Sequence, residues 1–148
     1  MAFRYPLQPL LRLRESLERQ EEQRLFASAA VVSRLRAEIE RLHEAGVEAQ
    51  REALQEMSLG SPGALLQFAA SCEAAFRSAC RKLQLQLDEA ERKRLLQLRA
   101  YQAVRQKREI LQGLRERQEA AYQLEFARHE QQTADESFLI RLFSTSSE

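Results

Sequence analysis

The chain has 148 residues, of which 44% are hydrophobic and 30% charged, and its formal net charge is +1. It contains no tryptophan, four glycines and three prolines, a composition that fits a long helical rod with little interior better than a compact globular domain. No apolar run approaches the roughly 20 residues that span a bilayer, and the N-terminus lacks the apolar core of a signal peptide. We therefore expect a cytoplasmic protein without direct membrane insertion.

The first predicted element is a short non-helical lead that ends at Pro9, because proline favours extended backbone in the residue before it. A helix is predicted from about Leu10 to Met57. Its apolar residues recur mostly in heptads, but the facing position at Glu21 is polar, and the spacing there predicts a stutter in the coiled coil. The apolar residues with helical spacing are Leu10, Leu17, Leu25, Val32, Leu35, Ile39, Leu42, Ala49, Ala53 and Met57.

A turn is predicted at residues 58–63, where two of the four glycines lie close together with a proline between them. Gly60 suits a left-handed C-cap for the first helix. Ser61 can cap the next helix through its hydroxyl group, and Pro62 suits the first helical position, where no amide donor is needed. The chain is therefore expected to reverse its direction at this point.

A second helix is predicted from Pro62 to about Leu142, followed by a polar tail over residues 143–148. If the two helices are antiparallel, facing residues should have numbers with a constant sum near 121, and the apolar residues follow this rule. The pairs that follow it are Leu10/Leu111, Leu17/Val104, Leu35/Leu87, Ile39/Leu83, Leu42/Ala79, Ala49/Cys72 and Met57/Leu65. Gly46 falls opposite Phe76, where the missing side chain makes room for the ring. The sequence predicts an all-α fold, a long antiparallel two-helix coiled-coil hairpin in a single domain.

The two predicted helices differ in length. By the same rule, Pro9 faces Gln112 or Gly113, so about 30 residues at the end of the second helix overhang. This segment still carries apolar residues, namely Leu114, Ala121, Tyr122, Phe126, Phe138, Leu139, Ile140, Leu142 and Phe143. Exposed apolar surface without a partner in its own chain marks a surface for another chain. We expect a partner protein there, with self-association into a homomeric coiled coil or a disordered end as alternatives.

Charge is unevenly distributed along the second helix. Residues 81–117 hold eleven Lys or Arg against five Asp or Glu, whereas residues 118–148 hold two against six. The basic block is either a solvated helix face or an electrostatic guide for an acidic partner. No base-reading motif accompanies it, so we expect no nucleic acid.

Neither an active site nor a cofactor or metal site is expected. His43 and His129 lie on different helices, and the glycines form no phosphate-binding loop. Cys72 and Cys80 are eight residues apart on one helix, about 12 Å along its axis, which is too far for a disulfide. We expect both to be small core residues in a non-enzymatic binding protein.

The segment from Arg108 to Glu136, REILQGLRERQEAAYQLEFARHEQQTADE, resembles the C-terminal signature of the flagellar FliJ family. The hairpin with its turn near residue 60 is similar as well. Further resemblance lies in the opening residues Phe3, Arg4, Tyr5, Pro6, Leu7, Leu10, Leu11, Leu13 and Arg14. The resemblance implies an antiparallel two-helix component of the flagellar type III export apparatus. Members of this family are held in the pore of the hexameric export ATPase and promote its assembly. They link the ATPase to the membrane export gate and handle export chaperones, in peripheral association with the inner membrane.

Two sets of contact residues are implied by position. The set that would face the ATPase is Arg108, Arg115, Arg117, Gln118, Glu125, Arg128, Glu130, Gln131, Asp135 and Glu136. The set that would contact the export gate is Phe68, Cys72, Ala75 and Ala79. The chain departs from the family pattern at Cys72 and Ala79, which also fall on the predicted seam, so only Phe68 is expected to be exposed. Two alternative functions stay open from the sequence. The protein could be the equivalent stalk of a virulence-type secretion system, or a homo-oligomeric structural coiled coil.

Overall fold

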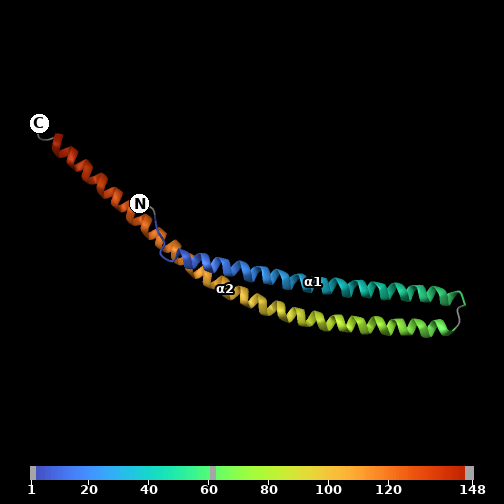
Figure 1. Ribbon diagram of the computed structural model, residues 1–148. Coiled ribbons are helices and arrows are strands. Elements are labelled where there is room, and N and C mark those ends of the chain that lie inside the picture. The colour runs from blue at the N-terminus through green and yellow to red at the C-terminus, as the bar shows by residue number, and fades with distance from the viewer. Residues whose placement is uncertain (1–2, 61–62, 146–148) are drawn as a thin grey trace. The chain divides into compact units, whose positions relative to one another are not determined.

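The computed structural model describes residues 3–60 and 63–145, and these residues form two helices without a strand, α1 (Gln8–Ser58) and α2 (Gly63–Thr145) (Figure 1). The predicted all-α fold with two long helices packed against each other is confirmed. α2 remains helical to Thr145, into the segment expected to be a polar tail. The chain divides into two compact units, unit 1 (Met1–Glu18 and Ala103–Glu148) and unit 2 (Arg19–Gln102).

In unit 2, the second part of α1 and the first part of α2 run antiparallel on either side of the turn (Figure 1). Their core consists of buried residues from both helices with two half-buried neighbours, namely Val32, Leu35, Leu87, Ala90, Ile39 and Leu83. These residues belong to one cluster and include the predicted facing pairs Leu35/Leu87 and Ile39/Leu83. Fully burying a leucine or valine side chain contributes about 1.5–3 kcal/mol, so this cluster is the main source of apolar stabilisation in unit 2.

Nearer the turn, the predicted register is also confirmed. A Cβ atom added at Gly46 would lie 3.6 Å from the Cγ atom of Phe76, so this glycine does face the phenylalanine ring. Gly60 has a φ of +88° and its amide donates to the Met57 carbonyl oxygen at 3.2 Å, which confirms the left-handed C-cap. The roles predicted for Ser61 and Pro62 lie outside the described residues.

In unit 1, the N-terminal lead and the first turns of α1 pack on α2. The most buried side chain is Leu11 (0% exposed), whereas Leu10 is 38% exposed, so the predicted seam position of Leu10 is wrong. Counting back along α1 from Val32 in alternating steps of four and three residues gives a series of buried or half-buried positions that ends at Leu11. This series includes Glu21 and Glu18. The buried face of α1 therefore keeps its heptad repeat by accepting glutamates in the seam, where the sequence had predicted a stutter.

Candidate functional site

The end of α2 carries an extended apolar surface. Tyr122 is the last half-buried residue that the structure describes, and every residue from 123 to 144, the overhang, is exposed. Its large apolar side chains are 46–71% exposed, namely Leu124, Phe126, Phe138, Leu139, Ile140, Leu142 and Phe143. Because successive helical residues point about 100° apart, the apolar residues between 138 and 143 are spread over more than half of the helix circumference.

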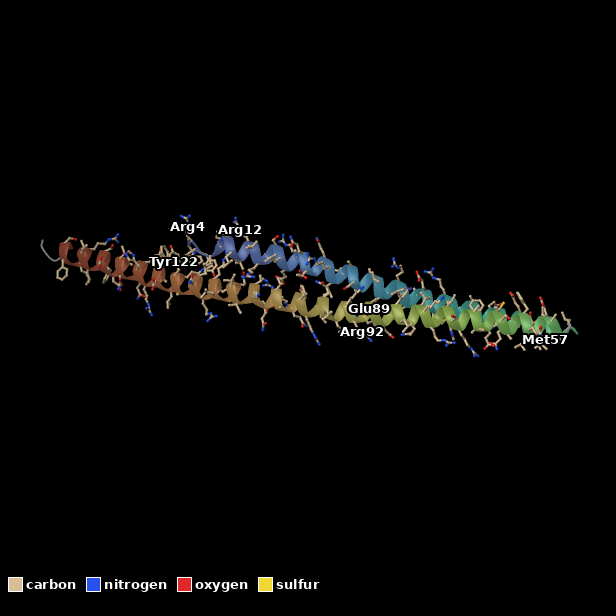
Figure 2. The ribbon with its side chains drawn as sticks, turned by 60° about the horizontal axis from the view of Figure 1, so that its bottom comes forward. Arg4, Arg12, Met57, Glu89, Arg92 and Tyr122 are labelled. Atoms are coloured by element: carbon tan, nitrogen blue, oxygen red, sulfur yellow. The ribbon has the colours of Figure 1, made fainter. Side chains whose placement is uncertain are left out.

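The overhang begins later than the sequence predicts, because the lead covers α2 beyond Gly113. The Tyr5 hydroxyl donates to the Leu111 carbonyl oxygen at 3.2 Å, and Tyr5 is only 6% exposed. The Phe3 ring lies 5.7 Å from the ring of Tyr122, centroid to centroid, and Tyr122 stacks on Phe126 at 6.4 Å. Figure 2 shows Tyr122 on α2 close to the lead that carries Arg4.

The expected boundary was wrong because it placed the end of the covered part of α2 opposite Pro9 and did not count the non-helical lead as cover. An extended residue advances up to about 3.3–3.6 Å along its path, against 1.5 Å in a helix, so a non-helical lead of a few residues reaches much further along α2 than the same number of helical residues. The aromatic residues Phe3 and Tyr5 around Pro6 are the sequence signal that could have indicated this cover.

One member of the predicted ATPase-facing set is held within its own chain. The Arg108 guanidinium donates to both carboxylate oxygens of Glu18, at 2.6 and 3.2 Å, and both side chains are at least three-quarters buried. The hydrogen bonds and charge of Glu18 raise the pKa of Arg108, so this arginine stays charged. Arg108 therefore contributes to packing in unit 1 whatever else it contacts.

The other members of this set have different surroundings. Arg115 is half-buried, and Arg117 is exposed with its Nε atom donating to the Gly113 carbonyl oxygen at 3.2 Å. The remaining members are all exposed, namely Gln118, Glu125, Arg128, Glu130, Gln131, Asp135 and Glu136. At about 100° per residue, Arg117 and Arg128 lie on one face and Glu130 on nearly the opposite one. The set therefore surrounds the helix rather than forming one stripe.

The predicted gate-facing set lies early in α2. Phe68 is 67% exposed and Ala75 is exposed, whereas Cys72 and Ala79 are half-buried on the side of α1. The expected exposure of Phe68 is therefore confirmed. Phe68 and Cys72 line a groove of about 410 Å³ between the two helices, which also contacts Phe76. Small residues on both helices leave this groove open.

A metal-binding cluster and a membrane-spanning helix are both absent from the described residues. Within residues 3–60 and 63–145, no group of three or more His, Cys, Asp or Glu side chains is placed to hold a metal ion. Cys72 and Cys80 are both free thiols. No helix in this part of the chain combines the length and apolarity needed to cross a membrane.

The sequence was compared with protein-family models, curated proteins and solved structures. The family model described as "Flagellar FliJ protein" matches residues 3–148. Among curated proteins and among solved structures, the comparison finds no match. Because the family match spans nearly the whole chain, and the two helices have the arrangement that the resemblance implied, the chain belongs to the flagellar FliJ protein family.

Proposed function

We propose that this protein is a non-enzymatic stalk and adaptor of the flagellar type III export apparatus. It binds the hexameric export ATPase through the overhang, promotes assembly of the ATPase ring, and links it to the export gate and to export chaperones. Membership of the FliJ family indicates a protein of the flagellar export apparatus. The named partners come from the resemblance of the sequence to this family.

The observation that supports ATPase binding is the apolar overhang. A single helix of this length has little stability in water from helix propensity alone, and large apolar side chains are rarely gathered on a surface that stays exposed. Because Phe138, Leu139 and Ile140 point in three different directions and all three are at least half exposed, a partner that encloses the helix would cover them better than one that contacts a single face. A ring of subunits around the overhang meets this requirement.

The contact with the export gate is proposed for Phe68. Its ring is exposed beside an apolar groove, whereas Cys72 and Ala79 are half-buried between the helices. A partner at this position would bury the Phe68 ring and reach the neighbouring Ala75. Cys72 and Ala79 would support the site from the seam side.

The test is the rate of ATP hydrolysis by the cognate export ATPase in the presence of a chain that ends at Tyr122. This truncation leaves the contacts of Phe3 and Tyr5 with α2 in place, so we expect the remaining helices to stay folded by circular dichroism. We expect stimulation of ATP hydrolysis to be lost. Stimulation equal to that of the full chain would remove the overhang from the mechanism.

A full-length pair of variants separates a specific contact from a general loss of apolar surface. We expect Phe138→Ser with Leu139→Ser to reduce stimulation strongly. The control, Phe26→Ser, removes a similarly exposed ring on α1 (69% exposed) and should leave stimulation unchanged.

A further inference from the structure

The N-terminal lead covers one face of α2 beyond the part that α1 covers. Because α1 begins at Gln8, the facing rule lets α1 itself cover α2 no further than about residue 114. Beyond that point, the half-buried residues that the structure describes in α2 are Arg115, Glu119 and Tyr122, and the residues between them are exposed. Steps of four and three residues place these three side chains on one face of the helix. The lead therefore lies along this face.

Two side chains of the described lead, residues 3–7, attach it to α2. Tyr5 is buried and its hydroxyl donates to the Leu111 carbonyl oxygen at 3.2 Å, and the Phe3 ring lies 5.7 Å from the ring of Tyr122. The other side chains of this segment are exposed, namely Arg4, Pro6 and Leu7. A segment attached in this way can leave α2 by a local opening, while the helices stay folded.

The first turns of α1 are attached to α2 by other contacts. Leu11 is fully buried, and Glu18 accepts both hydrogen bonds of the Arg108 guanidinium, at 2.6 and 3.2 Å. Between the lead and α1 lies a turn in which the Gln8 amide donates to the Tyr5 carbonyl oxygen at 3.2 Å. Opening this turn breaks a single backbone hydrogen bond, so the lead can detach while α1 stays in place.

The lead lies on a stretch of α2 that carries members of the predicted ATPase-facing set. Arg115 is on the covered face, whereas Arg117 and Gln118 are exposed on other faces of the same stretch. One turn beyond Tyr122, the ring of Phe126 stacks on it at 6.4 Å and is 46% exposed. A partner that encloses α2 at this level needs every face of the helix, including the one that the lead occupies.

We propose that the lead is an autoinhibitory strap, which occupies part of the ATPase-binding surface of α2 and is displaced when the ATPase ring encloses the helix. This inference rests on the proposed function and adds a regulation of the same site. When a ligand binds only one conformation, its apparent affinity falls with the fraction of molecules in that conformation. The bound lead therefore lowers the affinity of the free protein for the ATPase and covers the Tyr122 ring until the ring of subunits is present.

The first test is the concentration of full-length chain that gives half-maximal stimulation of ATP hydrolysis by the cognate export ATPase. Phe3→Ala with Tyr5→Ala removes both attachments of the lead, and circular dichroism checks that the helices stay folded. We expect the half-stimulating concentration to fall by at least about threefold, since the loss of one hydrogen bond alone shifts an equilibrium by about twofold to tenfold.

The matched control is Leu7→Ala, which shortens an exposed apolar side chain of the same segment and leaves both attachments intact. It should not change the half-stimulating concentration. An unchanged concentration for the double variant would overturn the proposal. A higher one would overturn it as well, because the lead would then belong to the surface that binds the ATPase.

The second test holds the lead on α2 by a reversible link. The native thiols are removed by Cys72→Ser with Cys80→Ser, and Phe3→Cys with Tyr122→Cys places two new thiols where the rings lie close together. A short crosslinker with a reducible disulfide then joins them. We expect the linked chain to stimulate the ATPase at least about tenfold less well than the same sample after reduction. Both forms have one sequence, so an effect of the substitutions on folding cancels.

The outcomes separate this inference from the function on which it rests. Equal stimulation by the linked and the reduced chain would overturn the strap and leave the proposed function standing. If the unchanged full-length chain did not stimulate the ATPase, the proposed function would be wrong and the strap with it. Unlinked full-length chain treated with the same reductant is the control for the reduction step.

Discussion

The contact between Gly46 and Phe76 makes a sharp test of the helix register in unit 2. Replacing a glycine in the interior of a helix by alanine removes a destabilisation of roughly 0.5–1 kcal/mol, because glycine loses more backbone freedom on folding. A Cβ atom at residue 46 would meet the Phe76 ring at 3.6 Å, an ordinary van der Waals distance. Gly46→Ala should therefore increase the free energy of unfolding by about 0.5–1 kcal/mol.

A larger side chain at the same position should have the opposite effect. The three further carbon atoms of leucine would be directed toward the Phe76 ring, and overpacking of this kind costs about 1–3 kcal/mol. The gain in helix propensity, about 0.8 kcal/mol, offsets only part of that cost. Gly46→Leu should therefore lower the free energy of unfolding by roughly 0.5–2 kcal/mol.

Urea denaturation followed by circular dichroism measures both changes, and Gly113→Ala is the matched control. At Gly113 the added Cβ would find only the guanidinium of Arg117, at 4.0 Å, so this variant reports helix propensity without a facing ring. We expect Gly46→Ala and Gly113→Ala to stabilise by similar amounts. If Gly46→Ala destabilised the protein as Gly46→Leu should, or if Gly46→Leu were neutral, the facing pair would be wrong.

Two further predictions concern unit 1 and its polar contacts. Tyr5→Phe removes the hydrogen bond to the Leu111 carbonyl oxygen and should lower the free energy of unfolding by about 0.5–1.5 kcal/mol, with faster amide hydrogen exchange in the covered part of α2; unchanged exchange would contradict a bound lead. Arg108→Gln breaks the two hydrogen bonds to Glu18, mostly shielded from water, and should destabilise by about 1–2 kcal/mol. The same change at Arg36, in a more exposed pair, should cost less than about 1 kcal/mol. Equal costs in urea titrations would show that shielding does not matter here.

The sequence predicts the hairpin of unit 2 well because two physical signals agree there. Apolar residues repeat with helical spacing on both sides of one turn, and each helix has only the other to pack against. Leu35, Leu87 and the Gly46/Phe76 pair could therefore be placed from residue numbers alone. Phe68 could be called exposed because its position is one step from the seam.

The same reasoning fails in the first half of α1, where the spacing of apolar residues alone does not predict which residues are buried. Burial of Leu11 rather than Leu10 depends on two glutamates being tolerated in the seam, and the polar partners that make this possible lie far away in the sequence. In unit 2 the Glu21 carboxylate accepts a hydrogen bond from the Gln97 side chain. A rule that counts only apolar residues reads such a position as a break, although the helix continues through it.

The polar contacts of unit 1 also determine where the overhang starts. A carboxylate turned toward a partner helix is costly to leave unpaired, so Glu18 favours the one alignment that places it beside Arg108. Sliding the start of α1 by a heptad along α2 would break that ion pair and move the Tyr5 hydroxyl away from the Leu111 carbonyl oxygen. It would also separate the ring of Phe3 from its aromatic contact. Three independent contacts thus select the same alignment, which places Phe3 beside Tyr122, the last half-buried residue of α2 that the structure describes, and leaves the apolar side chains that follow it exposed.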